Sequence, residues 1–329
     1  MYPTKLQPAV KNYLWGGKRL AQEFNIASKD PSIAEAWMLS CHSNGESRIL
    51  NGPLSGQTLG EVLFGEAETA LGTSASLAGY FPFLIKLIDA GKDLSVQVHP
   101  DDAYAQAHEG GFGKTEVWYV LDAAEGASVR YGFTRAVTKE EIRQRIASQT
   151  LDEVLRKIPV RRGDVIFVPP GTVHAIGAGI LIAEVQQNSD ATYRLFDYGR
   201  TDQSGKLRQL HIEKALDVAI LEPAPDLKPV EMQDREGYEI SLLASCAAFT
   251  SELARIRSFA EFHVGTYSMV SAVVTGGAGR ILFANRSFGS DGEMEIRKGT
   301  SVFLPAGTGG FRIEGKCEVL LTARGRIAT

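Results

Sequence analysis

Residues 163–171 read Gly-Asp-Val-Ile-Phe-Val-Pro-Pro-Gly, and residues 299–307 read Gly-Thr-Ser-Val-Phe-Leu-Pro-Ala-Gly. Each stretch begins with a glycine, continues as an apolar run of strand length and ends in Pro-x-Gly. Glycine permits a sharp entry into the strand, and the proline with the second glycine defines an exit turn. The echo between the two stretches therefore predicts a duplicated β unit.

The two copies diverge just after the exit turn. The first copy continues Thr-Val-His, which ends at His174, whereas the second continues Thr-Gly-Gly, which ends at Gly310. An imidazole can bind a metal ion, and glycine has no side chain to do so. This difference predicts one working site in the first half of the chain and a structural copy in the second half.

Short runs rich in β-branched and aromatic residues, separated by Gly, Pro and Asp, dominate the chain and predict a mainly β sandwich or barrel. The predicted strands are 94–98, 116–121, 164–168, 181–185, 269–274, 279–283, 301–304 and 317–322. Thr138 and Glu141 have the spacing of a capping box, which predicts a helix from there to about Lys157. Further helices are expected at 16–24, 57–64 and 213–221.

A proline-rich polar segment, Leu-Glu-Pro-Ala-Pro-Asp at 221–226, is the best candidate for a linker. We therefore expect a first domain, 1–222, that carries the metal site and the helical insertions. The second domain, 223–329, is expected to be a degenerate β unit without metal ligands.

Composition limits the possible partners and compartments. The 329 residues have a formal net charge of −4, which argues against nucleic acid or a membrane surface as the main partner. Three widely spaced cysteines predict reduced thiols rather than disulfides. The first residues lack the apolar stretch of a signal peptide, and the longest apolar region, 165–185, is broken by prolines and glycines. A cytoplasmic protein is expected.

Polar residues that can bind a metal interrupt the apolar strands of the first half. Gln97 and His99 lie two apart at a strand end, and Lys114 and Glu116 lie two apart at the next strand, so each pair shares one face. His174 follows the Pro-x-Gly turn in an apolar stretch. Two imidazoles, one carboxylate and one amide oxygen suit a borderline metal such as zinc, with a position open for substrate or water.

The spacing of these residues resembles a known superfamily. Residues 91–99 read Gly, five residues, Gln-x-His, and residues 163–174 read Gly, five residues, Pro-x-Gly-x-x-His. These patterns are similar to the two cupin motifs, with Gln97 in place of the usual first histidine. Together with Lys-x-Glu at Glu116, and with a Glu and an Arg ten residues apart at Glu184 and Arg194, the pattern resembles type I mannose-6-phosphate isomerase in its short bacterial form. The resemblance runs from about residue 5 to about 220.

This resemblance implies two cupin-type jelly-roll β-barrels with helical excursions. It implies one zinc ion per chain, with four ligands: Gln97, His99, Glu116 and His174. It also assigns catalytic roles to three residues: Arg194, Glu184 and Lys114. The implied partners are small sugar phosphates, mannose 6-phosphate and fructose 6-phosphate.

Aldose–ketose isomerisation of a sugar phosphate requires the same kinds of groups: a base, a cation and a phosphate-binding side chain. Proton transfer between C1 and C2 through an enediol needs a base, and the charge on the two oxygens needs a cation. A phosphate handle needs Arg or Lys, and Arg offers two parallel hydrogen bonds. If the strand after Val185 runs back antiparallel, Arg194 returns to the metal end. The sequence leaves the identity of the base open between Glu184 and other groups.

Two other functions remain open from the sequence. An iron-dependent cupin dioxygenase would favour a histidine at Gln97 and has no evident use for Lys114 or Arg194. A non-catalytic sugar-sensing bicupin would tolerate loss of metal ligands, yet the first half keeps all four candidates.

Overall fold

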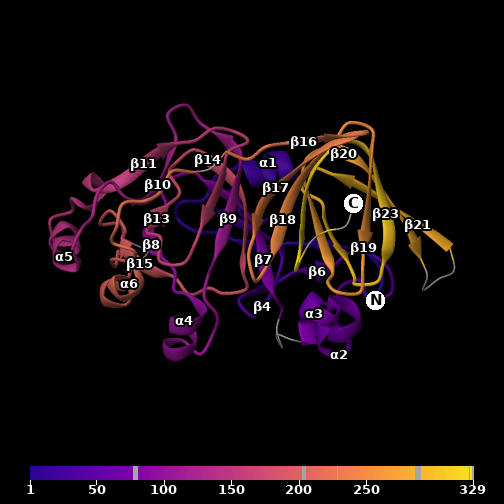
Figure 1. Cartoon of the computed structure of the whole chain (residues 1–329), viewed down its shortest axis with the longest axis horizontal. Coiled ribbons are helices and arrows are strands. Elements are labelled where there is room, and N and C mark those ends of the chain that lie inside the picture. Colours follow the sequence, from indigo (N-terminus) through magenta and orange to yellow (C-terminus); the bar gives the residue numbers. More distant parts are fainter. Residues whose placement is uncertain (77–80, 202–204, 228, 286–289, 326, 328–329) are drawn as a thin grey trace.

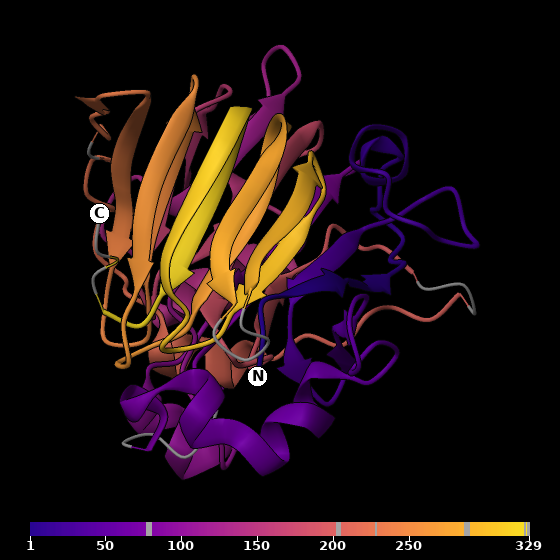
Figure 2. The same ribbon diagram turned by 90° about the vertical axis from the view of Figure 1, so that its right-hand side faces the viewer.

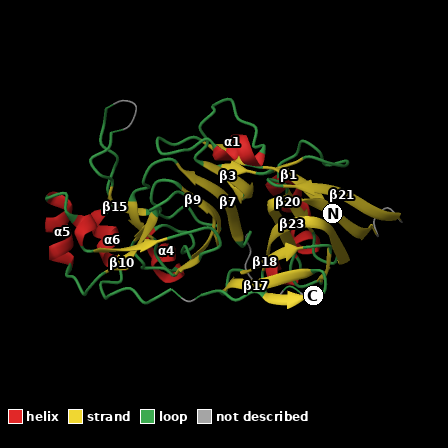
Figure 3. Ribbon diagram, turned by 90° about the horizontal axis from the view of Figure 1, so that it is seen from above, coloured by secondary structure: helices red, strands yellow, loops and turns green. Residues whose placement is uncertain are grey.

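The computed structural model describes residues 1–329 except 77–80, 202–204, 228, 286–289, 326 and 328–329. The protein is mainly β, as the sequence predicts. Three large antiparallel sheets follow one another along the long axis of the molecule, with helices at the outer ends and edges (Figures 1 and 3). No helix in the described ranges is long and apolar enough to cross a membrane.

The first sheet has five strands, in the order β11-β10-β13-β8-β15. Their bounds are Leu155–Pro159 (β11), Ser128–Phe133 (β10), His174–Ala175 (β13), Val96–Val98 (β8) and Tyr193–Phe196 (β15). Its outer face packs on α5 (Lys139–Ala147) and α6 (Ile212–Val218) through residues such as Ile142 and Leu216. Helix α4 (Asp102–His108) follows β8.

The second sheet has six strands, in the order β12-β9-β14-β7-β3-β2. Their bounds are Val165–Val168 (β12), Glu116–Ala123 (β9), Ile180–Gln187 (β14), Phe83–Ala90 (β7), Glu35–Leu39 (β3) and Ala9–Lys11 (β2). All of its strand pairs are antiparallel.

The third sheet has ten strands. The chain of pairs runs β16-β17-β18-β23-β20-β22-β1-β6, with β19 beside β23 and β21 beside β20 (Figure 2). Their bounds are Gln233–Arg235 (β16), Tyr238–Ser245 (β17), Thr250–Ile256 (β18), Phe259–Val264 (β19), Val270–Asn285 (β20), Ser290–Arg297 (β21), Ser301–Leu304 (β22), Gly309–Ala323 (β23), Thr4–Gln7 (β1) and Arg48–Ile49 (β6). The N-terminal strand β1 thus completes a sheet built mostly from the last hundred residues.

The remaining elements are short, apart from one helix that lies below the ten-stranded sheet in Figure 2. They are α1 (Arg19–Phe24), α2 (Leu59–Leu71), α3 (Thr73–Ser76), a single 3-10 turn (Leu151–Glu153) and the hairpin of β4 (Cys41–His42) with β5 (Gly45–Glu46).

The six-stranded sheet is buried on both faces. Its side chains point alternately to the two faces, and each face packs against another sheet. On β7, Ile85 and Leu87 join a core with Phe303 and Leu320 of the ten-stranded sheet. Ile88, on the opposite face, joins a second core that includes residues of the five-stranded sheet. The middle sheet therefore presents one face to the ten-stranded sheet and the other to the five-stranded sheet.

The two echoing stretches form the local structure predicted for them. Each contains a strand, β12 or β22, that follows a glycine with positive φ: +95° at Gly163 and +89° at Gly299. Each ends in a second glycine with positive φ, +82° at Gly171 and +75° at Gly307. Residues that carry a side chain rarely adopt this backbone conformation, which explains why glycine occupies all four positions.

Two predicted elements are corrected. Thr138 caps α5 as expected, because its side chain accepts a hydrogen bond from the backbone N–H of Glu141. The helix nevertheless ends at Ala147 rather than near Lys157, since Gln149 adopts a left-handed conformation (φ +60°) and residues 155–159 pair with β10. The strands expected at 269–274 and 279–283 are one strand, β20, with a register shift after Val274.

A buried carboxylate joins the middle sheet to the ten-stranded sheet. Glu318 on β23 accepts hydrogen bonds from Tyr119 Oη (2.9 Å) on β9, Arg255 Nε (3.0 Å) and Thr275 Oγ1 (2.9 Å). Burial, and then the charge of Glu318, raise the pKa of Tyr119 to about 12, so the phenol remains a donor at neutral pH. Hydrogen bonds to a buried carboxylate are stronger than neutral ones, so this cluster helps to hold the two sheets together.

We expect Glu318→Ala to lower the free energy of unfolding by about 1–3 kcal/mol, because it leaves buried donors unpaired. Urea denaturation monitored by circular dichroism measures the change. Glu293→Ala is the control, since the ion pair of Glu293 with Arg280 is exposed and its loss should change stability by less than about 0.5 kcal/mol. Equal stability of the Glu318 variant and the wild type would show that the cluster does not join the sheets.

Candidate metal centre and substrate cavity

The strand register places three polar residues in one row across the five-stranded sheet. Gln97 on β8 is directly opposite His174 on β13 and, on its other side, directly opposite Arg194 on β15. Directly opposite residues of antiparallel strands project from the same face. The row His174–Gln97–Arg194 therefore lies on one face of this sheet.

A second polar row crosses the six-stranded sheet. Glu184 on β14 is opposite Lys86 on β7 and opposite Trp118 on β9, and Lys86 is opposite Trp37 on β3. Gln97 and Arg194 of the first row line the same cavity as Lys86, Glu184 and Trp37. The two rows thus face each other across the space between the sheets.

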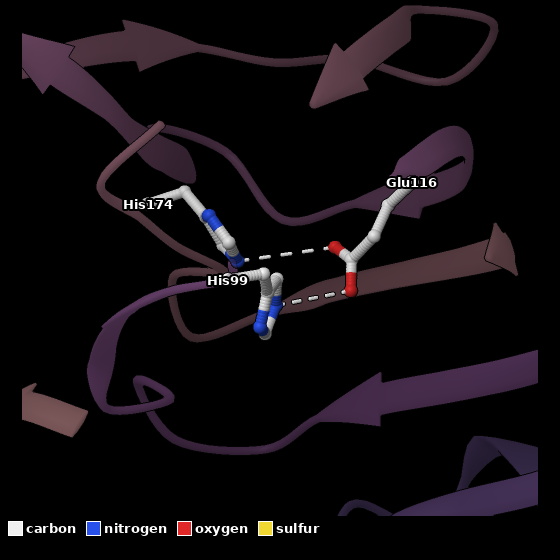
Figure 4. A group of neighbouring side chains, drawn as sticks. All are labelled: His99, Glu116 and His174. Atoms are coloured by element: carbon white, nitrogen blue, oxygen red, sulfur yellow. Dashed lines mark ion pairs between the residues drawn. The ribbon is translucent and has the colours of Figure 1, made fainter. Parts of the chain in front are cut away.

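Three potential metal ligands converge at one end of this space (Figure 4). His99 follows β8, Glu116 begins β9 and His174 begins β13, and all three side chains are buried. His99 Nε2 lies 3.2 Å from Glu116 Oε1, and His174 Nε2 lies 3.8 Å from Glu116 Oε2. All the ligand atoms of the group lie within 4.8 Å of one another.

Backbone carbonyls hold both imidazoles in the tautomer that suits a metal ligand. Nδ1 of His99 donates to the carbonyl oxygen of Ala191 (2.9 Å), and Nδ1 of His174 donates to that of Thr172 (2.8 Å). A carbonyl can only accept, so the proton of each neutral ring lies on Nδ1. Nε2 of each ring therefore presents a lone pair toward Glu116.

The charges of the three residues follow from their burial. Burial, helped by the nearby Lys114 ammonium, lowers the pKa of His99 to about 3, and burial also lowers the pKa of His174. Burial alone would raise the pKa of Glu116, but Lys114 and then His99 hold it well below its usual range. At neutral pH, two neutral imidazoles and one carboxylate thus direct lone pairs at one another, an arrangement that a cation stabilises.

Lys114 already places a cation among these groups. Its Nζ donates to Glu116 Oε1 (2.5 Å) and to His99 Nε2 (3.3 Å). Lys114 lies two residues before Glu116, the first residue of β9, and both side chains are buried. Because the two side chains are hydrogen-bonded to each other, they face the same way, as the sequence predicts.

Glu184 is linked to the metal-ligand group through Trp118. The indole Nε1 of Trp118 lies 3.0 Å from an oxygen of Glu116 and 3.0 Å from an oxygen of Glu184. Burial, and then the nearby Glu116 charge, raise the pKa of Glu184. Lys86 Nζ lies 3.3 Å from the second oxygen of Glu184. Glu184 is therefore a carboxyl group able to change protonation state beside the cavity.

Lys86 lies between two carboxylates. In addition to Glu184, its Nζ lies 3.8 Å from Glu35, which accepts a hydrogen bond from the indole of Trp37 (2.6 Å). Burial opposes the charge of Lys86, but Glu35 and then Glu184 raise its pKa above the ordinary value. Lys86 therefore remains protonated.

Arg194 is a cavity cation with uncharged partners. Its Nε donates to Ser95 Oγ (3.2 Å) and its guanidinium donates to the carbonyl oxygen of Gln209 (2.9 Å). Burial and the neighbouring Arg208 lower the pKa of Arg194. Among the described contacts of Arg194 there is no carboxylate, whereas Arg208 pairs with Asp197 (3.1 Å). The positive charge of Arg194 is thus available to an anionic ligand.

The cavity between the two rows has a volume of about 420 Å³, large enough for a sugar phosphate. Its lining includes five cationic side chains, Lys11, Lys86, Lys114, Arg194 and Arg208. A larger hollow of about 1310 Å³ lies against the ten-stranded sheet, but charges there such as Arg280 and Arg312 pair with exposed glutamates.

The structure brings the sequence-predicted residues to one place. Gln97 Nε2 lies 3.3 Å from His174 Nε2, and Arg194 reaches the cavity beside Gln97. Arg194 reaches this place because β15 pairs antiparallel with β8 of the five-stranded sheet, a partner that the sequence did not identify.

The sequence analysis missed other residues of the cavity. Lys86 is the only charge within the buried apolar run Phe-Leu-Ile-Lys-Leu-Ile of β7, and an isolated charge in such a strand is a usable signal. Glu35 and Trp37 lie in the segment Ala-Glu-Ala-Trp-Met at 34–38, to which no site role was assigned from the sequence. Lys11 and Arg208 lie in polar stretches that carry no comparable signal.

The second echoing stretch leads to a glycine where the first leads to a histidine. Gly310, at the place that His174 has in the first unit, is opposite His263 in the pairing of β19 with β23. Within the described ranges, no group of three or more His, Cys, Asp or Glu side chains other than His99, Glu116 and His174 could hold a metal ion.

Comparisons with known proteins agree on one family. The family model described as phosphomannose isomerase type I, catalytic domain, matches residues 4–126. The mannose-6-phosphate isomerase of Streptococcus mutans is 40% identical over 319 residues, which cover 97% of this chain and 97% of that protein. The crystal structure of mannose 6-phosphate isomerase from Bacillus subtilis has a TM-score of 0.88 at 34% identity, covering 98% of this chain and 99% of that one.

A further structure, of a zinc-bound mannose 6-phosphate isomerase, shares the fold with a TM-score of 0.78 at 18% identity, covering 99% of this chain and 100% of that one. The similarity to the Streptococcus and Bacillus proteins extends over nearly the full length of all three chains. The chain therefore belongs to the type I mannose-6-phosphate isomerase family.

Proposed function

We propose that the chain interconverts mannose 6-phosphate and fructose 6-phosphate with one bound zinc ion. The observation that carries this proposal is the buried His99–Glu116–His174 group, which contacts Lys114 and Gln97 in the lining of a cavity rich in cations. The group suits a metal, and the cations suit the phosphate and the negative charge of an enediol-type reaction. The Streptococcus and Bacillus relatives carry the name of the same activity.

The ligand group fits zinc. Tetrahedral zinc with bonds of about 2.0–2.2 Å separates its ligand atoms by roughly 3.3–3.6 Å. His99 Nε2 lies 3.2 Å from Glu116 Oε1 and His174 Nε2 lies 3.8 Å from Glu116 Oε2, so each histidine is near that range from one of the two carboxylate oxygens. With one ligand atom taken from each residue, the three atoms lie within 4.8 Å of one another. Gln97, 3.3 Å from His174, is the fourth ligand that we propose, through its amide oxygen after the amide turns end for end. The zinc-bound mannose 6-phosphate isomerase that shares the fold supports zinc as the metal.

The protein's own groups supply the remaining chemistry. Bound zinc provides a Lewis acid for the substrate oxygens. Glu184, with its raised pKa, is placed to take and return a proton beside the cavity. Lys114 is paired with Glu116 and Lys86 with Glu184, so each lysine stabilises the negative charge of its carboxylate. These side chains are buried between the two sheets, which limits the access of water to them. We assign Arg194, Glu184 and Lys114 as catalytic residues on this basis.

We also propose how the chain is divided. The five- and six-stranded sheets would be the two sheets of a cupin-type jelly roll within 1–222, with helical insertions. Residues 223–329 would form the second, degenerate jelly roll, to whose sheet β1 and β6 from the start of the chain are added. Strands β12 and β22 both lie between glycines with positive φ, which supports a duplication. The hydrophobic core between the five-stranded and six-stranded sheets supports a sandwich.

An assay of the purified protein tests the activity directly. We expect conversion of mannose 6-phosphate to fructose 6-phosphate, loss of activity after treatment with a chelator, and recovery when zinc is added back. Mannose without phosphate should react far more slowly, because the cationic cavity then has no anion to bind. Full activity in metal-stripped protein would contradict the proposal.

Removal of single ligands tests the metal site. We expect His99→Ala, Glu116→Ala and His174→Ala each to deplete bound zinc and abolish activity, because each removes a ligand. Gln97→Ala should have a smaller effect, since a neutral amide is the weakest of the four donors. Elemental analysis of the purified variants measures zinc. His263→Ala is the control, and retention of stoichiometric zinc by His174→Ala would show that the site is elsewhere.

The role of Arg194 is tested by Arg194→Lys, which keeps the charge and loses the planar pair of donors. We expect turnover to fall by roughly two to three orders of magnitude, the scale of losing one electrostatic stabiliser. Zinc content and the unfolding curve should stay as in the wild type. Normal turnover of the lysine variant would show that Arg194 serves only to bind Ser95 and Gln209.

A further inference from the structure

We propose that Gln186 and Ser189 are positioning residues for the metal centre. Both hold the turn 187–191, whose last carbonyl orients His99, and the inference rests on the metal site proposed above. Nδ1 of His99 donates to Ala191 O (2.9 Å), and this bond sets both the tautomer and the direction of the ring. Whatever holds the Ala191 carbonyl therefore controls where Nε2 of His99 points.

Gln186 holds the turn from the strand that lies beside Glu116. It is opposite Glu116 in the pairing of β14 with β9, and it is fully buried. Its side-chain Nε2 donates to the carbonyl oxygens of Gln187 (2.8 Å) and Ser189 (2.7 Å). Both partners are acceptors, so the amide cannot turn end for end without losing both bonds.

The orientation of this amide has an energetic cost. The other side-chain atom of Gln186, Oε1, is buried and has no hydrogen-bond partner within the described part of the chain. An unpaired buried acceptor is uncommon in a folded protein. The turn thus keeps both amide hydrogens of Gln186 on its carbonyls while the oxygen goes without a partner.

Ser189 fixes the same turn from the other side. Its hydroxyl donates to the carbonyl oxygen of Phe112 (2.7 Å) and accepts from the backbone N–H of Ala191 (3.2 Å). Residue 112 lies just before Lys114, so the serine ties the turn to the loop that leads into β9. The backbone of Ala191 is thus held on both sides, because its N–H donates to Ser189 and its carbonyl accepts from His99.

The hydrogen bonds of Gln186 and Ser189 could stabilise the turn alone or could also position His99, and experiments can distinguish these two roles. If these hydrogen bonds only stabilised a surface turn, their loss would change the unfolding curve and leave the affinity of the folded protein for metal unchanged. If they position His99, their loss lets the Ala191 carbonyl and the imidazole move. Changes to groups that orient metal ligands typically weaken metal binding by about 10–100-fold.

The experiment compares Gln186→Met, which has similar volume and no donors, with Ser189→Ala. The control is Ser251→Ala, because Ser251 is equally buried and its hydroxyl pairs with Thr322 (3.2 Å) in the ten-stranded sheet. Zinc affinity is measured by competition with a chromophoric chelator. The visible absorption of the Co²⁺-substituted protein reports the geometry of the ligands, and circular dichroism verifies that each variant is folded.

We expect both turn variants to bind zinc about 10–100-fold more weakly and to show an altered Co²⁺ spectrum, with Ser251→Ala unchanged in both. Excess zinc should restore most of the turnover. Wild-type affinity and spectrum in both folded turn variants would overturn this inference and leave the metal site intact. Failure of the wild type to bind either metal would overturn the metal site as well.

Discussion

The carboxylate of Glu116 is the constraint on which the site depends, because it is completely buried between two sheets. A buried carboxylate is tolerated only when charges and hydrogen-bond donors compensate it. Lys114, the indole of Trp118 and the two imidazoles surround it. Since neither imidazole carries a proton on its Nε2, the negative charge is compensated by the Trp118 N–H and by cations, and the surroundings of Glu116 are therefore suited to metal binding.

The compensation works only in one register. Side chains alternate between faces, so a shift of β8 by one residue would turn Gln97 away from the cavity and away from the face that carries His174 and Arg194. The same holds for Glu184 and Lys86 on the middle sheet. Apolar residues on the opposite face, such as Ile85 and Leu87, stabilise the observed register because they must face the ten-stranded sheet. Core packing on one face thus determines the chemistry on the other.

The features that could be predicted from the sequence depend on neighbours along the chain. The strand–turn pattern at 163–171 and the pairs around His99 and Glu116 rely on alternation and turn chemistry, and the structure brings these residues together. The cap of α5 at Thr138 is of the same kind. The predicted end of that helix, near Lys157, was wrong because residues 155–159 pair with β10, and this tertiary contact overrides the local helical pattern.

Features created by long-range pairing could not be predicted. Nothing in the polar stretch around Arg208 shows that it lines the cavity, and the place of Arg194 beside Gln97 depends on pairing of β15 with β8. Lys86 could have been found, because a lone charge in an apolar strand requires a partner. Its partner Glu184 is nearly a hundred residues away, so the sequence would have indicated a buried ion pair without its location.

The second echoing stretch has the strand pattern of the first and leads to Gly310 where the first leads to His174, and its strand β22 belongs to the ten-stranded sheet. The ten-stranded sheet covers the face of β7, β9 and β14 opposite the metal site. Without it, apolar residues on that face would lie in water, and the strands that carry Glu116 and Glu184 would lose the packing that sets their register. Tyr119, three residues after Glu116, donates to Glu318 of this sheet. The ten-stranded sheet, which provides none of the four proposed metal ligands, therefore serves the site by packing against the strands that carry Glu116 and Glu184.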